Sequence, residues 1–257
     1  MRHHLVSGLH IAIITSISRK FGGSMLALDA FAICKKFGIP AILATFDHRH
    51  HYPNIGGDLR RLQMPDVRTP YRAQFQALDD LSQVLDEARA NSKFVIIDVA
   101  AGFNLNHPMF EVFRNCGILN ASTTAALLPI MSGDYGTCGA LAAMRSFTSF
   151  GIRFDRGLIR QSSLHERSVK TDLSRLPNFP VWRVGCLSNR AMELINQELV
   201  RVGNPSHFDL PRLLRIQAQE CVPASDRGPL QEAIDYFDVA QNAILRSILA
   251  PISKVIS

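Results

Sequence analysis

The residues from Arg19 to Ser24 bring two cations, two glycines and a hydroxyl together in one short segment. A segment of this kind between a strand and a helix can bind phosphate, because free backbone N–H groups and the positive end of the helix dipole meet there. The apolar run before it, His10–Thr15, has the length and isoleucine content of a strand. After it, apolar side chains recur at helical spacing over 24–37, so a helix with Ser24 as its N-cap is predicted.

The segment matches a P-loop only in part. A P-loop reads G-x-x-x-x-G-K-[ST]. Gly22 fits the second glycine and Ser24 the hydroxyl that ligates Mg²⁺, whereas Gly23 stands at the lysine and the first glycine is missing. The charge that neutralises the β- and γ-phosphates would have to come from Arg19 or Lys20. By itself, the pattern favours a tight strand-to-helix turn over a phosphate site.

Two aspartates stand at the ends of further predicted strands. The apolar run 39–46 is typical of a strand buried on both faces, and Asp47 follows it directly. The run 93–99 is a second strand of this kind, with Asp98 near its carboxyl end. Because ligands bind beyond the carboxyl ends of parallel strands, the glycine segment, Asp47 and Asp98 are expected along one edge. The simpler alternatives are that Asp98 caps a turn and that Asp47 pairs with Arg49.

The rest of the chain alternates between strand and helix patterns. Runs typical of strands span 123–130, 156–161 and 181–187. Segments with a helical period span 74–90, 108–116, 137–150, 190–200, 211–219 and 229–249. This alternation predicts an α/β fold with a doubly wound, mainly parallel sheet and helices on both faces. The 257 residues fit a single domain, 1–257, with a C-terminal amphipathic helix and tail over 229–257.

The segment 52–72 is rich in Pro, Gly and Arg and is predicted to be a long irregular loop. Apart from Tyr71, no stacking aromatics are interleaved with its arginines, so solvated arginines are favoured over a nucleic-acid contact. These arginines are Arg60, Arg61, Arg68 and Arg72. In the helix that follows, one side is expected to carry Phe75, Leu78, Leu81, Leu85 and Ala88.

Composition narrows the class of protein. The chain is 47% hydrophobic and 19% charged, which is ordinary for a soluble globular protein, and no apolar stretch approaches the roughly 20 residues of a membrane span. A signal peptide is disfavoured, because the first apolar run leads straight into the glycine segment. The five cysteines form no C-x-x-C pair, which favours a reduced, cytoplasmic protein. The net charge of +6 favours an acidic partner such as nucleic acid or an anionic lipid surface.

The order of these features resembles the ParA/MinD family of deviant-Walker, SIMIBI-class P-loop ATPases over most of the chain. Residues 96–102, Ile-Ile-Asp-Val-Ala-Ala-Gly, resemble the family's third-strand segment, whose aspartate contacts Mg²⁺ through water. Asp47 occupies the second acidic position of the family's D-x-D segment. The sequence Leu-Leu-Pro-Ile at 127–130 resembles a fourth strand that ends in proline, and Gln161 stands where the family has a base-contacting asparagine.

This resemblance implies a P-loop NTPase-like fold with ATP or ADP and Mg²⁺ as cofactors. The implied nucleotide-binding residues are Arg19, Lys20, Gly22, Gly23, Ser24, Met25 and Gln161. The resemblance also implies that Ser24 and Asp98 hold the metal, one directly and one through water, while Asp47 orients the attacking water.

Two departures from the family pattern limit the expected use of ATP. Gly23 replaces the phosphate-binding lysine, and Ser18 stands where the family's signature lysine reaches across the dimer. We therefore expect a ParA/MinD-like partition or positioning protein, for plasmid or DNA segregation, conjugation or placement of a cell apparatus, with weakened or lost ATP use. The expected partners are a second copy in a homodimer and a protein of the partition or transfer system, with non-specific DNA as a further candidate. Both a weak ATPase and a nucleotide-independent scaffold stay open.

Two alternatives from other classes fit the same residues. The first is an α/β enzyme that acts on a phosphorylated or anionic small molecule at the same edge. The second is a basic DNA-binding adaptor, whose affinity for DNA would fall steeply with salt.

Overall fold

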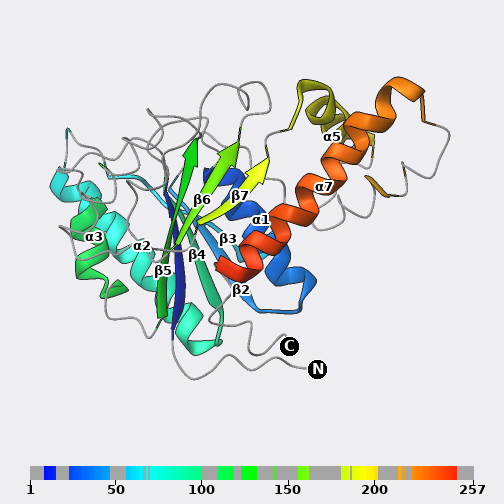
Figure 1. Cartoon of the computed structure of the whole chain (residues 1–257). Helices are drawn as coiled ribbons and strands as arrows, with labels where there is room; N and C mark the ends of the chain where they lie inside the picture. Colours follow the sequence, from blue (N-terminus) through cyan, green and yellow to red (C-terminus); the bar gives the residue numbers. More distant parts are fainter. Residues whose placement is uncertain are drawn as a thin grey trace.

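The strands of the computed structural model form one sheet with the order β3-β2-β4-β1-β5-β6-β7, in which the pairings between described residues are parallel (Figure 1). The structure describes residues 9–15, 23–46, 56–65, 68, 70–99, 109–118, 123–131, 142, 156–161, 181–185, 187–201, 214–215, 217 and 222–247. The strands are β1 (His10–Thr15), β2 (Ala41–Thr45), β3 (Leu59–Arg61), β4 (Phe94–Val99), β5 (Thr123–Met131), β6 (Arg156–Gln161) and β7 (Val181–Gly185). The helices are α1 (Gly23–Lys36), α2 (Pro70–Ala90), α3 (Met109–Asn115), α5 (Asn189–Arg201) and α7 (Ala224–Ser247), with a 3₁₀ turn η1 (Gly56–Asp58).

The central strands are covered by helices on both faces. In β1, Ile11 and Ile13 pack with α2 and α3, whereas Ala12 and Ile14 pack with α1. Successive side chains of a strand point to opposite faces, so a strand between two helical layers needs an apolar residue at every position. This explains the continuous apolar runs of the sequence, and it confirms the predicted doubly wound, parallel α/β fold.

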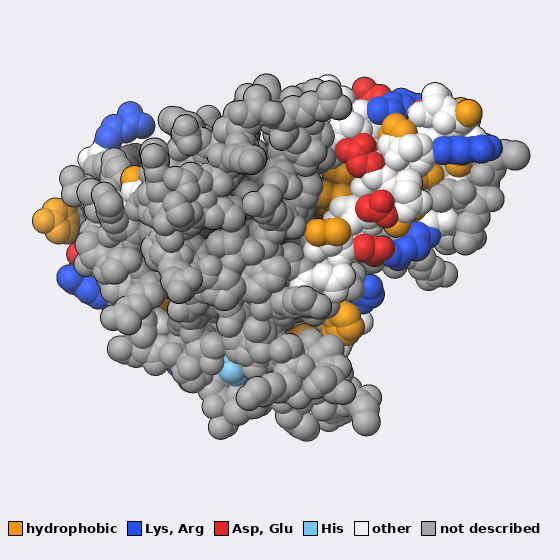
Figure 2. Space-filling view, viewed as in Figure 1, with side chains coloured by type: hydrophobic (Ala, Val, Ile, Leu, Met, Phe, Trp, Pro, Cys, Tyr) orange, Lys and Arg blue, Asp and Glu red, His pale blue; other side chains and the backbone are white. Residues whose placement is uncertain are grey.

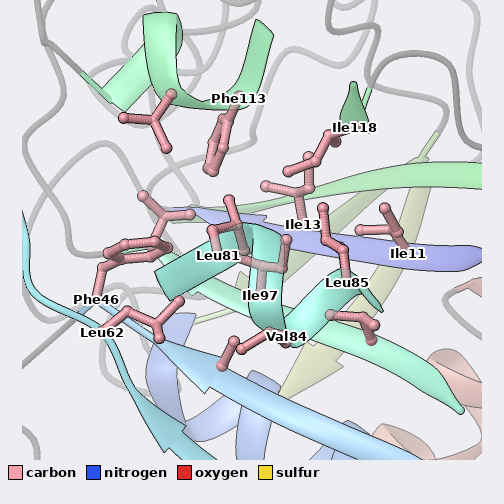
Figure 3. Close-up of a cluster of buried hydrophobic side chains, with 14 of the residues drawn as sticks. Ile11, Ile13, Phe46, Leu62, Leu81, Val84, Leu85, Ile97, Phe113 and Ile118 are labelled. Carbon is pink, nitrogen blue, oxygen red and sulfur yellow. The ribbon is translucent and has the colours of Figure 1, made fainter. Parts of the chain in front are cut away.

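Buried apolar side chains form one cluster on each face of the central strands, and the cluster between the sheet and α2 is the larger. Figure 3 shows Leu81 and Leu85 of α2 pointing toward Ile13 and Ile97 of the sheet. The ring of Phe46 meets that of Phe113 edge to face, with 6.5 Å between centroids, and so brings α3 into the same cluster. The covered sheet thus holds the ends of β1, β2 and β4 in a fixed register.

The prediction of an irregular loop over 52–72 is wrong. The structure has η1 and β3 in this segment, and α2 begins at Pro70, four residues before the predicted start. β3 lies at the edge of the sheet and is only three residues long, so its sequence, Leu-Arg-Arg, gives no apolar run. Proline is favoured at the first position of a helix, because its missing N–H would have no helical partner there.

The prediction that Phe75 shares one side of α2 with Leu81, Leu85 and Ala88 is also wrong. Leu81, Leu85 and Ala88 lie in the core as expected, but the Phe75 side chain is 64% exposed. Successive helical residues turn by about 100°. Phe75 therefore lies well away from the centre of the buried face, which passes through Ala77 and Leu81.

The other described elements agree with the predicted ones within two residues at each end, except at the start of α7. Of the helices predicted over 137–150 and 211–219, the structure describes only residues 142, 214, 215 and 217, so both predictions lie largely outside the described residues. Of the described helices, none is long and apolar enough to cross a bilayer.

Helices α5 and α7 pack together through a separate apolar cluster that includes Leu194, Leu230 and Ile234. α7 begins at Ala224, five residues before the predicted start at Pro229. Arg190 of α5 donates two hydrogen bonds to Asp226, at 2.9 and 2.8 Å, and so anchors the added first turn of α7. Long-range pairing of this kind leaves no local signal in the sequence, which is why the helix start was misplaced.

A network of charged side chains joins α1, η1, β3, α2 and the start of β4. Asp58 accepts hydrogen bonds from Lys35 and from Lys93, the latter at 3.3 Å, and Glu87 accepts bonds from Arg60 at 2.7 Å and from Lys93 at 3.0 Å. Burial raises the pKa of Asp58, but the bonds from the two lysines outweigh burial and hold the pKa below its ordinary value of 3.8. The hydrogen bond from Arg60 lowers the pKa of Glu87 below 4.5. Burial lowers the pKa of Lys93, but its two carboxylate partners raise it above 10.5.

Replacing Lys93 with methionine is expected to lower the free energy of unfolding by about 1 kcal/mol near pH 7, as for a partly exposed ion pair. The depressed pKa values of Asp58 and Glu87 mean that their contribution is present above about pH 4.5 and is lost as the pH falls further. The raised pKa of Lys93 means that its contribution is lost above about pH 10.5. Urea unfolding at pH 3, 7 and 11, with Lys36→Met as the control, checks this. A difference from wild type that is as large at pH 3 as at pH 7 would contradict it.

Candidate functional site

Asp98 is a completely buried carboxylate next to the carboxyl end of β4. It lies level with Ile14 of β1 and with Thr45 of β2, so the ends of these three strands are aligned. Thr45 Oγ1 donates a hydrogen bond of 3.1 Å to Asp98 Oδ2, and the backbone N–H of Phe46 donates one of 2.9 Å to the Asp98 carbonyl. The acid is therefore held rigidly, by a side chain and by the backbone of the neighbouring strand.

The alternation of side chains assigns Asp98 to the face of the sheet that α1 covers. Ile96 and Phe94, two and four residues before it, pack in the α1 cluster, and Val95 and Ile97 pack in the opposite one. By the same alternation Thr45 shares the α1 face. Because α1 follows β1, which lies beside β4, the first turn of α1 and the Asp98 side chain share one edge and one face of the sheet.

Thr45 is the site residue that sequence reasoning missed. Its side chain is 1% exposed although it is polar. A hydroxyl at the end of an otherwise apolar, doubly buried strand is the signal that would have found it, because buried polar groups need hydrogen-bond partners.

The first turn of α1 carries no side chain that would repel an anion. α1 begins at Gly23, one residue before the predicted start, so Ser24 lies inside the first turn and not at the N-cap. The first turn contains no acidic residue, whereas Lys35 and Lys36 complement the dipole at the last turn. An N-cap serine bonds N–H groups of its own helix. Ser24 is half-buried and lies two positions past the N-cap, so it is not committed to that role.

The remaining candidate residues are distributed as follows. Met25 follows Ser24 in the first turn of α1. Gln161 is the last residue of β6, level with Gly185 of β7, and lies three strands from β4, or roughly 14 Å across the sheet at about 4.8 Å per strand. The structure thus brings Gly23, Ser24 and Met25 to the edge that holds Asp98, and it keeps Gln161 apart from them along that edge. The other predicted site residues, Arg19, Lys20, Gly22 and Asp47, lie outside the described residues.

Within the described part of the chain, no three His, Cys, Asp or Glu side chains gather into a group that could hold a metal ion. A zinc-type or calcium-type site needs several protein ligands. Mg²⁺ keeps most of its water ligands and takes only one or two ligands from the protein. Ser24 and Asp98 offer a donor set of this size.

No protein-family model matches the sequence, and no curated protein matches it either. Among solved structures, the MinD cell division protein of Aquifex aeolicus is similar with a TM-score of 0.50 at 11% sequence identity, over 93% of this chain and 98% of that one. A ParA family ATPase from Chlorobium tepidum TLS is similar with a TM-score of 0.52 at 13% identity, over 90% and 98%. At such identities the likeness is one of fold, and the chain therefore has the P-loop NTPase-like α/β fold that the MinD and ParA family structures share.

Proposed function

We propose that this chain is a ParA/MinD-like positioning or partition protein, which binds ATP or ADP with Mg²⁺ weakly at the carboxyl edge of its sheet. The observation that carries the proposal is Asp98, a completely buried carboxylate held by Thr45 on the face of the sheet covered by α1. Buried carboxylates in proteins are paired or coordinate metals.

The positions of the residues suggest which of them would bind the phosphates and which would bind Mg²⁺. The first turn of α1 would receive the phosphates, because the first N–H groups of a helix have no partner within it and this turn contains no acidic side chain. Ser24 would ligate Mg²⁺, and Asp98 would hold one of the metal's waters. Mg²⁺ supplies the charge neutralisation that phosphates require.

Two features account for the proposed weakness. Gly23, the first residue of α1, has no side chain to pair with the phosphates where a P-loop has lysine. Arg19 or Lys20 would supply that charge from the preceding segment. Affinity that relies on a long side chain from outside the helix turn falls short of that of a complete P-loop, because ordering such a side chain costs entropy.

We infer further that the protein acts in the cytoplasm, as a homodimer together with a protein of a segregation, conjugation or positioning system. Whether ATP is hydrolysed depends on Asp47, whose proposed role is to orient the attacking water. The cargo is not specified by the residues of the edge.

Calorimetric titration of the full chain with ATP tests the proposal. With 5 mM Mg²⁺ we expect binding with a dissociation constant of roughly 100 μM, and at least tenfold weaker binding when EDTA replaces the metal. The absence of heat at millimolar nucleotide, or an affinity that ignores Mg²⁺, would contradict it.

In an alternative function, a different ligand binds at the same carboxyl edge of the sheet. The first turn of α1, which contains no acidic residue, would also accept the phosphate group of a small-molecule substrate. The protein would then be an enzyme that acts on this substrate. Thermal stabilisation by inorganic phosphate or ribose 5-phosphate that exceeds stabilisation by ATP with Mg²⁺ would favour this enzyme over the positioning protein.

A further inference from the structure

The outer face of α2 carries two large aromatic side chains in solvent. Tyr71 is 77% exposed and Phe75 is 64% exposed. They are separated by four residues, so they lie next to each other on the helix. The core side of the same helix is complete without them, since it is formed by Ala77, Leu81, Val84, Leu85 and Ala88. The fold gives these two rings no role in the described interior.

Exposed aromatic rings beside an arginine are typical of a protein interface. Tyrosine, phenylalanine and arginine are enriched at interfaces, and Tyr and Arg dominate among residues that carry binding energy. Arg72 is exposed on the same face, and among the described residues no carboxylate pairs with it. Figure 2 shows hydrophobic side chains next to Lys and Arg side chains at the left edge of the view, where Figure 1 places α2 and α3.

The charge of this face reverses along the helix. An exposed stripe at helical spacing consists of Arg72, Phe75, Gln76, Asp79, Gln83, Asp86 and Ala90. Its first half contains Arg72 and the positive end of the helix dipole. Asp79 stands two turns further along, at the middle of the stripe, and Asp86 follows near its end, where it is already paired with Arg89 at 2.8 Å. A face with one sign at each end is complementary to a copy of itself that runs in the opposite direction.

We propose that a second copy of this chain docks on this face, with the two α2 helices antiparallel about a two-fold axis between Phe75 and Gln76. In this register, residue i faces residue 151 minus i, which puts Arg72 of each copy opposite the partner subunit's Asp79. Both ion pairs form at once, because a two-fold contact is isologous. The Phe75 rings meet beside the axis, where they are removed from water.

The contact is small, and this sets its strength. A buried aromatic side chain covers about 150–250 Å². Two copies of each ring, two-thirds to three-quarters exposed beforehand, would therefore bury roughly 400–750 Å². A specific interface needs about 1,000 Å², so the rings supply much of it and the flanking polar side chains supply the rest. We expect a dimer with a dissociation constant in the micromolar range.

Nucleic acid fits this face less well than a second copy does. Phosphates would be attracted by Arg72, but Asp79 and Asp86 stand on the same stripe and repel them. A protein copy uses the carboxylates, whereas a nucleic acid would have to avoid them.

The inference rests on the homodimer of the proposed function and adds the surface through which the two copies meet; the contact is built on α2 alone and requires no nucleotide. It is therefore tested without nucleotide and with EDTA, so that failure of the nucleotide site would leave the result unchanged. Sedimentation equilibrium of the full chain from 1 to 200 μM measures the dissociation constant of the dimer.

Charge reversal gives the sharpest form of the test. Arg72→Asp and Asp79→Arg are each expected to weaken the dimer at least tenfold, and the double variant is expected to return to within about threefold of wild type. Phe75→Ser should weaken it at least tenfold without lowering the melting temperature of the monomer. Arg227→Asp, which reverses an exposed arginine on α7, is the matched control and should change nothing.

Three results would overturn the inference. The first is a monomer throughout the concentration range. The second is a dimer that none of the α2 variants weakens, or one that the double variant fails to restore. The third is a monomer that binds a fluorescein-labelled 20-nucleotide DNA through Phe75, which would assign the face to nucleic acid.

Discussion

Asp98→Asn is expected to abolish Mg²⁺-dependent nucleotide binding while the protein stays folded. Asparagine has nearly the same shape, and its carbonyl oxygen can still accept the hydrogen bond from Thr45, which is 3.1 Å long in the wild type. It cannot supply the negative charge that holds a water of the metal. Titration with ATP and Mg²⁺ should therefore show at least a tenfold loss of affinity, as when EDTA removes the metal, which is about 1.4 kcal/mol of binding free energy.

Two further variants separate the metal site from general effects of charge. Ser24→Ala removes the hydroxyl proposed to ligate Mg²⁺ and should weaken binding about tenfold. Asp79→Asn removes an exposed carboxylate of α2 and should leave the titration unchanged. Circular dichroism should give the same spectrum for all three variants. Asp98→Asn protein that binds nucleotide as tightly as wild type would contradict the assigned role of this acid.

Phe31→Ala is expected to cost about 3–5 kcal/mol of unfolding free energy, the range found when a buried aromatic side chain is truncated. Phe31 is completely buried on α1, in the cluster that also contains Ile96 and Leu43 of the sheet. Its removal would leave a cavity between the helix and the strands that carry Asp98 and Thr45. Urea unfolding should give a lower midpoint with an unchanged slope.

The matched control is the same substitution on the solvent side of α2. Phe75→Ala removes an identical side chain that is 64% exposed, so the stability of the monomer should change by less than about 0.5 kcal/mol. The comparison is made below 1 μM protein, where the proposed α2 contact does not form. Equal losses for Phe31→Ala and Phe75→Ala would show that the assigned burial is wrong.

The parts of the fold that could be predicted are those whose signal is local. β1 and β6 begin and end at the predicted residues. In β1 the signal is a continuous apolar run from Ile11 to Ile14, which is typical of a strand buried on both faces. β3 gave no such signal, since it is a three-residue edge strand paired with β2 alone. The start of α7 depends on Arg190 and Asp226, which are 36 positions apart, and no local pattern records such a pairing.

The candidate site divides in the same way. Asp98 could be placed at a strand end from the apolar run before it. The face on which it lies could not be predicted, because the sequence does not say which helix covers which side of the sheet. The partnership with Thr45 depends on the register between β2 and β4, which is set by packing of the whole sheet.

For Phe75 the sequence pattern gave a signal, but the prediction drawn from it was wrong. Its spacing to Leu78, Leu81 and Leu85 made it look like part of one apolar side of α2. Leu81 and Leu85 are buried, but Phe75 lies in solvent near the start of the helix. At 100° per residue, however, Phe75 lies about 120° from Leu81 around the helix. A list of apolar residues at roughly helical spacing therefore does not by itself place each of them on the buried face.

A structure of the protein in the presence of ADP and Mg²⁺ tests the central claim most directly. The claim predicts that the phosphates lie at the first turn of α1, with the metal near Ser24 and one of its waters on Asp98. Nucleotide bound elsewhere, or no nucleotide at millimolar concentration, would contradict it.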